Sequence, residues 1–323
     1  MRQAVVVLNM GGPDGLDAVE PFLFNLFNDP AIINVPQPLR WFLARRISKR
    51  RAPTAREIYA HLGGRSPLVA ETRAQAEALE TKLGSGFRVF VAMRYWHPLS
   101  EETVDEVKAY RPDGVTLLPL YPQYSSTTSW SSLIAWKHAA RRAGLNVPTT
   151  EICCYPTEPG WIDALTDLTR QGLAQASAFG PCRLLFTAHG LPKKIVDRGD
   201  PYQRQVEATV AAVVTALARP ELDWSLGYQS RVGRMEWIGP STESEIQRAG
   251  KENLGLVVVP VAFVSEHSET LVELDIEYRA VAEKSGVPCY IRVPTVRTKP
   301  TFINALAGLV RSSLSIDEKT TID

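Results

Sequence analysis

Short apolar runs rich in β-branched residues alternate along the chain with longer stretches in which apolar residues recur every three or four positions. The short runs are apolar throughout, which is typical of parallel strands buried on both faces. Strands are therefore predicted at Ala4–Leu8, Phe87–Ala92, Val115–Leu120, Leu184–Thr187, Leu256–Val264 and Cys289–Val293. Helices are predicted at Glu71–Lys82, Ser129–Arg142, Trp161–Ala174, Gln203–Ala218 and Thr270–Lys284. The alternation indicates an α/β fold in which helices connect parallel strands.

The segments that follow the strands form two similar sets. The first strand leads into Gly11-Gly12-Pro13, and the strand at 184–187 leads into His189-Gly-Leu-Pro192. This weak half-repeat predicts two similar open-sheet domains, residues 1–148 and 149–297, with a final helix at about 298–315 that packs back on the first domain. Open sheets of this kind bind ligands beyond the carboxyl ends of their strands.

Composition narrows the class of protein. A length of 323 residues suits two domains, and a net charge of +1 gives no indication of a nucleic-acid partner. The cysteines, at positions 153, 154, 182 and 289, form no C-x-x-C pair, so a zinc site or disulfide framework is not expected and a reducing cytosol fits best. No apolar run approaches the ~20 residues of a membrane-spanning helix. The Gly11-Gly12 turn lacks the spacing of a dinucleotide-binding loop, which argues against a nucleotide-dependent oxidoreductase.

A histidine follows directly on a predicted strand, in Phe186-Thr-Ala-His189-Gly. There, at the carboxyl edge of a sheet, a neutral imidazole could accept a proton or ligate a borderline metal ion. A single histidine is more often a structural group, so this motif needs support from elsewhere in the chain.

Acidic residues recur every four positions after the strand at 256–264. On an α-helix, Glu269, Glu273 and Glu277 would form one ladder of carboxylates. The simpler interpretation is a solvated face whose first turn favours acids, with Ser265 as the N-cap. A ladder of three turns exceeds what capping needs. Along a cleft it could relay divalent cations or protons, because each carboxylate raises the pKa of its neighbour.

Two further groups stand out. One is an apolar segment, Phe22–Phe27 with Ile32-Ile33, followed by seven cations without an acid between residues 40 and 56. We call residues 22–56 the lip. It is either a solvated basic helix or a surface that touches anionic lipid and pairs with a flat, carboxylated, apolar ligand. The other group is aromatic and lies in loops near residues 95, 121 and 237; each member alone is more often a packing residue.

Taken together, these residues resemble the ferrochelatase family, from Leu8-Asn-Met-Gly-Gly-Pro13 to about Leu314. The motifs that carry the resemblance are His189-Gly-Leu-Pro192, Tyr228-Gln-Ser-Arg-Val-Gly233, Trp237-Ile-Gly-Pro240 and His267-Ser-Glu-Thr-Leu-Val-Glu-Leu-Asp275, in this order. The resemblance implies an α/β fold of two similar Rossmann-like, chelatase-type domains with parallel sheets flanked by helices. It also implies an active-site cleft between them that holds a porphyrin, and insertion of Fe²⁺ with release of two pyrrole protons.

The resemblance implies residue roles as well. His189 and Glu269 are expected to be catalytic and to meet the metal, and His267, Glu273 and Asp275 to form a route for ions or protons. The residues expected to bind the porphyrin are Ile33, Arg51, Ser66, Arg94, Tyr95, Tyr121, Trp237 and Phe263. Whether His189 accepts pyrrole protons or acts as the last ligand of the metal stays open.

The chain departs from the family pattern at three positions. Glu266 stands where Asp is frequent, Ser268 where a β-branched apolar residue is common, and Arg65 interrupts what is often a triple glycine. Some relatives carry an iron–sulfur cluster on cysteines of a C-terminal extension. Residues 290–323 contain no cysteine, so we expect no cluster and no permanently bound cofactor, with Fe²⁺ as a substrate.

The lip favours protoporphyrin IX as the second substrate, because its apolar segment 22–36 resembles that of members that make protohaem at a membrane. A cytoplasmic enzyme in peripheral contact with the inner face of the membrane is expected, with no nucleic-acid partner and an undetermined oligomeric state. The alternatives are a coproporphyrin III ferrochelatase, a cobalt chelatase and a non-catalytic haem-binding or haem-delivery protein. A cobalt chelatase would usually have more than the five histidines present here, and a haem carrier would not need the carboxylate ladder.

Overall fold

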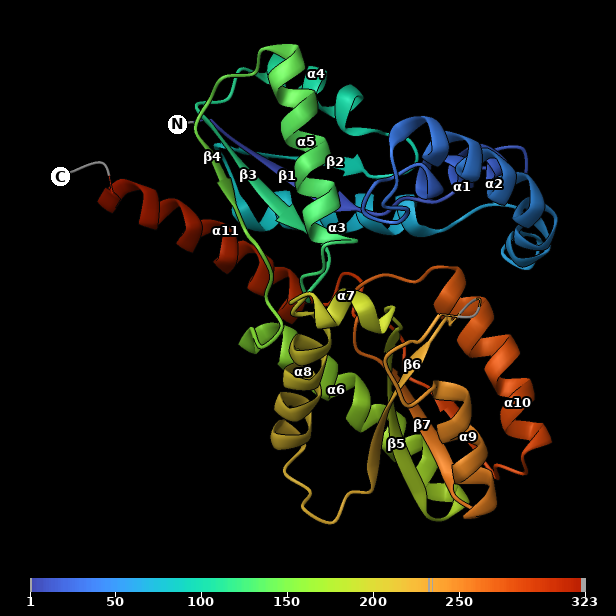
Figure 1. The fold of residues 1–323 in the computed structure, drawn as a ribbon. Coiled ribbons are helices and arrows are strands. Elements are labelled where there is room, and N and C mark those ends of the chain that lie inside the picture. The colour runs from blue at the N-terminus through green and yellow to red at the C-terminus, as the bar shows by residue number, and fades with distance from the viewer. Residues whose placement is uncertain (1, 232, 234, 321–323) are drawn as a thin grey trace. The chain divides into compact units, whose positions relative to one another are not determined.

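The computed structural model describes residues 2–231, 233 and 235–320 of the chain. Residues up to Cys154 and from Ile303 onward form one compact unit, and residues 155–302 form a second. Each unit is built round its own four-stranded parallel sheet, as Figure 1 shows. The predicted α/β fold with two similar parallel sheets flanked by helices is therefore confirmed.

The first unit has the strand order β2-β1-β3-β4. The strands are β1 (Gln3–Asn9), β2 (Phe87–Met93), β3 (Gly114–Pro119) and β4 (Thr149–Glu151). Helices α4 (Ser100–Tyr110) and α5 (Ser129–Ala143) pack together beside β1–β3, and α3 (Leu68–Leu83) contacts β1 and β2. The last helix, α11 (Pro300–Thr320), joins this unit from Ile303 onward, where Arg311 donates to the carbonyl oxygen of Lys82 at 2.9 Å.

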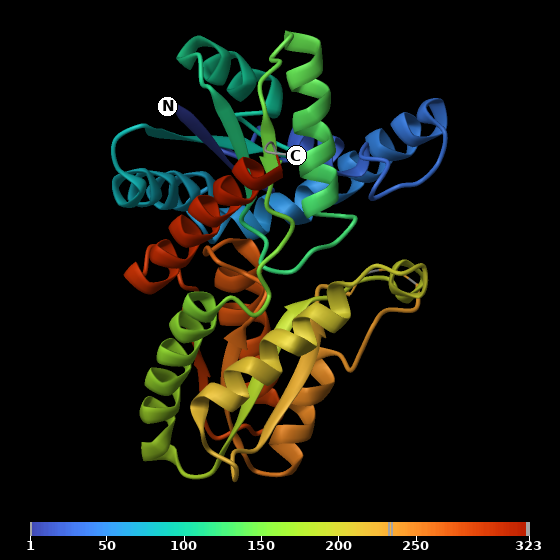
Figure 2. The ribbon, with the colours of Figure 1, turned by 90° about the vertical axis from the view of Figure 1, so that its left-hand side faces the viewer.

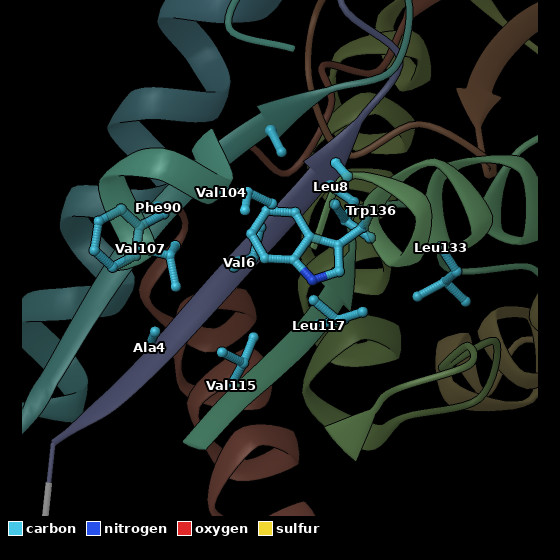
Figure 3. Packing of buried hydrophobic residues seen from close by; sticks show 12 residues of the cluster. Ala4, Val6, Leu8, Phe90, Val104, Val107, Val115, Leu117, Leu133 and Trp136 are labelled. Carbon is cyan, nitrogen blue, oxygen red and sulfur yellow. The ribbon is translucent and has the colours of Figure 1, made fainter. Parts of the chain in front are cut away.

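The core of the first unit explains why β1 is apolar along its whole length. All seven of its residues are buried, and alternate side chains face α4 and α5. Figure 3 shows the indole of Trp136, from α5, lying over β1 beside Val6 and Leu117. A strand packed by helices on both sides has no solvent face, so the alternation of polar and apolar residues that marks a surface strand is absent.

The second unit repeats the arrangement of the first. Its strand order is β6-β5-β7-β8, from β5 (Cys182–His189), β6 (Trp224–Gln229), β7 (Gly255–Pro260) and β8 (Tyr290–Arg292). Two of its helices, α6 (Pro159–Ala176) and α8 (Tyr202–Leu217), pack against each other, and α9 (Thr242–Lys251) packs with α10 (Tyr278–Lys284). Figure 2, turned by a quarter from Figure 1, shows these helices lying along the sheet of their own unit. The short elements are α7 (Lys193–Asp197) and η1 (Ser177–Phe179).

The two units share a strand order in which the first strand lies inside the sheet, with the second strand on one side and the third on the other. The strand order therefore reverses at this first strand. In the second unit this strand is β5, which has β6 on one side and β7 on the other. Ligands of open α/β sheets bind at this switch point, beyond the carboxyl ends of the strands. His189 is the last residue of β5 and therefore stands at that edge.

Two predicted elements are corrected by the structure. The strand expected at Leu256–Val264 ends at Pro260, the last residue that pairs with β5. The helix expected at Thr270–Lys284 is an α-helix only from Tyr278; residues Glu269–Glu277 form a π-helix, η2. The wider turn is accompanied by side-chain donors to its carbonyl groups: Tyr290 Oη donates to Leu274 O at 2.8 Å and Arg279 Nε to Asp275 O at 3.0 Å.

The lip folds as two helices, α1 (Val19–Phe27) and α2 (Gln37–Ala60), which pack against each other. The inner side of these two helices buries Val19, Phe22 and Tyr59. On their outer side Leu39, Trp41 and Phe42 are exposed by 54%, 39% and 71%. Among the helices that the structure describes, none is both long and apolar enough to cross a membrane.

Candidate active site

The centre of the candidate site in the second unit is a pair formed by His189 and Glu269. His189 ends β5, and Glu269 begins η2 after the loop that follows β7. Their side chains meet at 2.8 Å between Nδ1 and Oε2, with 41% and 24% of each side chain exposed. Because a carboxylate only accepts, Nδ1 carries the proton of this bond. The ring orientation that results presents Nε2 as the nitrogen for a substrate or metal ion.

The turn after His189 depends on a glycine. A side chain at Gly190 would place its Cβ 2.9 Å from the carbonyl oxygen of Gln229 and 3.3 Å from the ring of Trp237. The Gly190 backbone instead donates to that carbonyl oxygen at 2.9 Å. The close approach holds the ends of β5 and β6 together, and His189 lies directly beside Gln229 in the register of the sheet.

Gln229 turns its amide nitrogen toward the carboxylates. Thr187 donates to Gln229 Oε1 at 2.9 Å, and its hydroxyl also meets that of Thr242 at 2.8 Å. With Oε1 occupied as an acceptor, Nε2 points the other way and lies 3.4 Å from Glu269 Oε2 and 3.1 Å from Glu273 Oε2. A buried hydroxyl on one strand thus fixes an amide donor for two carboxylates.

Ser230 holds both carboxylates at once. Its hydroxyl oxygen lies 3.2 Å from Glu269 Oε2 and 2.5 Å from Glu273 Oε2, and its backbone N–H donates to Glu273 Oε1 at 2.8 Å. The residue has φ of 59°, in the left-handed region that is uncommon for residues other than glycine. Such conformations persist where surrounding contacts hold them, and they gather at functional sites.

The surroundings of the titratable groups in the site shift their pKa values in different directions. Burial would raise the pKa of Glu269, but the charge and hydrogen bond of His189, together with His267 and Ser230, lower it below its usual range. Burial lowers the pKa of His189, and the charge and hydrogen bond of Glu269 with the charge of Glu273 outweigh it and raise that pKa. Burial and the charge of Glu269 raise the pKa of Glu273. Glu269 is therefore the permanent anion, and Glu273 is the carboxylate that takes up a proton more readily.

His267 belongs to the same cluster. Its Nδ1 accepts from the backbone N–H of Glu269 at 3.0 Å, and its ring meets Phe263 edge-on with centroids 4.4 Å apart. Burial lowers its pKa, against the charges of Glu269 and Glu266. His267 is thus a neutral imidazole that orients the first turn of η2.

Two further acidic residues of this segment do not share the donors of Glu269 and Glu273. The predicted ladder of three carboxylates is wrong, because Glu277 is exposed and only Glu269 and Glu273 share Ser230 and Gln229. Asp275 pairs with Arg292, through Oδ1 to Nε at 3.0 Å and Oδ2 to Nη2 at 2.5 Å. The same guanidinium binds Glu266 at 2.8 Å. This arginine ties both ends of the segment 266–275 to β8.

In the first unit, Arg94 and Tyr95 gather round a buried aspartate. Arg94 Nη2 and Tyr95 Oη each lie 2.8 Å from Asp29 Oδ2, and the hydroxyl of Ser131 bonds the same oxygen. Tyr95 is 2% exposed, so its ring offers little surface to a ligand. Tyr121 is partly buried, with its hydroxyl 3.4 Å from that of Ser132.

The other residues expected to bind the porphyrin are more open. Ile33 is partly exposed beside Asp29, to which its backbone N–H donates at 2.9 Å. Arg51 is exposed on α2, with its guanidinium over the Phe27 ring at 5.7 Å. Ser66 packs so tightly on Gly12 that a Cβ there would lie 2.5 Å from its hydroxyl oxygen. Trp237 is partly buried beside Gly190.

Three residues of the site lie in the motifs or predicted helices of the sequence analysis but were assigned no role there. Gln229 and Ser230 belong to the motif at 228–233, and Tyr278, whose hydroxyl lies 3.2 Å from Glu273 Oε1, begins α10. In the sequence, Gln229 and Ser230 could have been singled out by their position between an apolar segment and Gly233. In the part of the chain that the structure describes, the candidate site included, no group of three or more His, Cys, Asp or Glu residues is placed to hold a metal ion.

Comparison with known proteins places nearly the whole chain in one family. The family model for ferrochelatase matches residues 2–314. The ferrochelatase of Caulobacter vibrioides is 53% identical over 318 residues, covering 97% of this chain and 90% of the relative. That of Wolbachia pipientis wMel is 50% identical over 313 residues, covering 96% and 98%. Among solved structures, SirB from Bacillus subtilis with Fe³⁺ matches with a TM-score of 0.59 at 12% identity, over 99% of this chain and 98% of its own; this likeness shows the fold alone.

Replacing Glu266 by Gln is expected to destabilise the protein in a pH-dependent way. Burial opposes the charge of Glu266, yet Arg292 and the backbone of Thr295 lower its pKa in the folded state. The charged carboxylate therefore stabilises the fold above the ~4.3 of an unfolded glutamate and stops doing so as the pH falls through the lowered value. We expect Glu266→Gln to lose about 1–3 kcal/mol at pH 7, and the loss to shrink below pH ~4.3.

Urea unfolding at pH 7, 5 and 4 measures this difference. Glu277→Gln is the matched control, because the same change is made on an exposed glutamate of η2 and should stay within about 0.5 kcal/mol of wild type. A loss for Glu266→Gln that is independent of pH would show that the charge of Glu266 does not stabilise the fold.

Proposed function

Because the chain belongs to the ferrochelatase family, we propose that it inserts Fe²⁺ into protoporphyrin IX to give protohaem, the last step of haem synthesis. The observation that carries the proposal is the hydrogen-bonded pair of His189 and Glu269 beside a second carboxylate, Glu273. Porphyrin metalation must remove two protons from pyrrole nitrogens and deliver a divalent cation to them. The site combines a base, His189, with one carboxylate of lowered pKa, Glu269, and one of raised pKa, Glu273.

His189 is the proposed acceptor of pyrrole protons. With Nδ1 bound to Glu269, its Nε2 is presented to the macrocycle, and the carboxylate stabilises the imidazolium that forms. The raised pKa makes the imidazole a stronger base than an isolated one. A positioned acid or base of this kind typically contributes ~10²–10⁴-fold to a rate.

Glu273 is the proposed next acceptor for the proton. Its pKa is raised by burial and by the charge of Glu269, while Glu269 stays ionised. Ser230 and Gln229 contact both carboxylates and so connect them. Protons can therefore leave His189 along this chain, and an incoming cation meets a fixed negative charge at Glu269. If His189 instead ligates the metal ion, the carboxylates of Glu269 and Glu273 still supply oxygen ligands for Fe²⁺ on its way to the porphyrin.

Protoporphyrin IX is the proposed porphyrin because of the lip. Protoporphyrin IX carries two propionates, whereas coproporphyrin III carries four and is much more soluble in water. An exposed apolar surface at Ile32, Leu39, Trp41 and Phe42 suits a poorly soluble ring that is handed over at a membrane. Arg51, exposed on the same helix, supplies a cation for a propionate.

The lip is also the proposed site of peripheral contact with the inner face of the cytoplasmic membrane. Trp41 and Phe42 form an edge-on pair with ring centroids 5.8 Å apart, and the guanidinium of Arg45 lies 5.6 Å from the Trp41 ring. Arg46, Lys49 and Arg50 follow on α2 and are exposed. Aromatic residues with cations on one amphipathic helix bind the interface of an anionic membrane. No iron–sulfur cluster or other resident cofactor is part of the proposal.

Substituting His189 by Ala is expected to abolish turnover while leaving porphyrin binding intact. Anaerobic incubation with protoporphyrin IX and Fe²⁺, followed by the loss of free-porphyrin fluorescence, measures turnover, and fluorescence titration without iron measures binding. The rate should fall by at least ~10²-fold. His138→Ala, on the exposed face of α5, is the matched control and should behave as wild type. Stoichiometric binding without turnover in the wild-type protein would favour a haem carrier.

Porphyrin preference is tested in the same assay with the two porphyrins in parallel. We expect a higher kcat/KM for protoporphyrin IX than for coproporphyrin III, because the apolar lip favours the ring with fewer carboxylates. Detergent-solubilised substrates at matched concentrations remove the effect of solubility. A clear preference for coproporphyrin III would overturn the assignment of substrate and leave the chelatase activity in place.

Membrane contact is tested by flotation with vesicles that contain phosphatidylglycerol. The wild-type protein should float with anionic vesicles and be released by salt, because the cations of α2 are screened. The double variant Trp41→Ser/Phe42→Ser should lose most of this binding. Phe179→Ser, which removes a ring that is 60% exposed in the second unit, is the control and should float as wild type. Equal flotation of the double variant and the wild type would exclude the lip as the contact.

A further inference from the structure

Two adjacent cysteines follow β4 and lie outside the site described above. The sulfur atoms of Cys153 and Cys154 are 2.9 Å apart. All four cysteines of the chain are in the thiol form, and Cys153 is exposed while Cys154 is partly buried. An S–S bond is ~2.05 Å long, so only a small movement separates this contact from a covalent bond.

The neighbours of the pair are anchored on both sides. Ile152 donates its backbone N–H to Leu117 O at 2.9 Å, which extends the pairing of β4 by one residue. Tyr155 is 3% exposed, with its ring near that of Phe302 at a centroid distance of 6.4 Å. The two cysteines lie between these anchors in neither helix nor strand, so their side chains are held close while the backbone between them can adjust.

We propose that Cys153 and Cys154 are a modification site: they form a reversible vicinal disulfide when the protein meets a small-molecule disulfide such as glutathione disulfide. Cys154, as the thiolate, attacks one sulfur of the oxidant and releases one small thiolate, which gives a mixed disulfide. Cys153 then gives up its proton to that thiolate and attacks the mixed disulfide at Cys154, which releases the second small thiolate. Two protein thiols are oxidised, and one small disulfide is reduced to two thiols.

The raised pKa of the Cys153 thiol sets this order of attack. Burial raises the pKa of Cys153 to about 12, helped by the hydrogen bond and the charge of Cys154. Cys153 therefore keeps its proton at neutral pH and is the second thiol to react, once its partner has become a mixed disulfide and its negative charge is gone.

A disulfide between neighbours in sequence is easily reduced. Consecutive Cα atoms are ~3.8 Å apart, below the ~4.4–6.8 Å at which most disulfides form. The resulting strain raises the reduction potential, which is typical of labile and regulatory disulfides. Because Cys154 is the last residue of the first unit and Tyr155 the first of the second, the ring would stiffen the chain where it passes from one unit to the other.

The other two cysteines provide a control within the same chain. Cys182 on β5 and Cys289 before β8 lie on either side of Gly255, with their Cβ atoms 3.5 Å and 3.3 Å from where a Cβ of Gly255 would be. Two strand spacings of ~4.8 Å separate their backbones, more than the ~7 Å that a disulfide can span. This pair shares a sheet face yet is unable to close.

The experiment compares two double variants with the wild-type protein, each incubated with glutathione disulfide. In Cys182→Ser/Cys289→Ser, intact mass spectrometry should show the loss of two hydrogens without bound glutathione, and peptide mapping should place the bond between residues 153 and 154. Dithiothreitol should reverse it. In Cys153→Ser/Cys154→Ser, we expect glutathione adducts at single cysteines at most and no internal bond.

Two results would overturn the proposal: stable glutathione adducts on Cys153 or Cys154 that do not close, or a disulfide between two chains on a non-reducing gel. Failure to react at all, while iodoacetamide labels Cys154, would overturn it equally. Mapping the oxidised wild-type protein gives the same answer should either double variant fold poorly. None of these readouts depends on chelatase activity.

Discussion

The candidate site depends on keeping two carboxylates close together beside one imidazole. Like charges in a partly buried site repel, and each carboxylate would raise the pKa of the other. Here one serine and one glutamine donate to both, and Nδ1–H of His189 donates to Glu269. As a result, the carboxylate of Glu269 is held as an anion, and that of Glu273 exchanges a proton more readily. The left-handed backbone at Ser230, the glycine at 190 and the π-helix are the local features of the backbone that accompany this arrangement.

The two units share a strand order and use the same edge of the sheet differently. The first strand of the first unit ends at Asn9 and runs into a tight glycine turn that packs on Ser66. The equivalent strand of the second unit ends at His189, the imidazole of the candidate site. One architecture thus provides one edge with a tight glycine turn near Arg94 and Tyr95 and another edge that carries His189 and its carboxylates.

The sequence predicts the buried strands well and the site only in part. Strands such as β1 are apolar on both faces and leave a clear signal, whereas β6, with Trp224 exposed and Gln229 at its end, does not. His189 and Glu269 were predicted together because each belongs to a recognisable motif. Spacing of four residues indicates an α-helix, so the π-helix and the outward turn of Glu277 were not predictable. The partners of Arg94 and Asp275 lie 65 and 17 residues away, and neither pairing leaves a local pattern.

The aspartate at the base of the lip gives that segment a mechanical property. A single oxygen of Asp29 accepts from Arg94 and Tyr95, which follow β2, and from Ser131 on α5. Helices α1 and α2 form an arm that this aspartate joins to the end of β2, beside the bond from Asn25 Nδ2 to Tyr95 O at 3.1 Å. A force applied to the outer end of the arm, where Trp41 and Phe42 are exposed, would reach Arg94 through that joint. Movement of the lip and the position of Arg94 at the carboxyl end of β2 are therefore mechanically coupled.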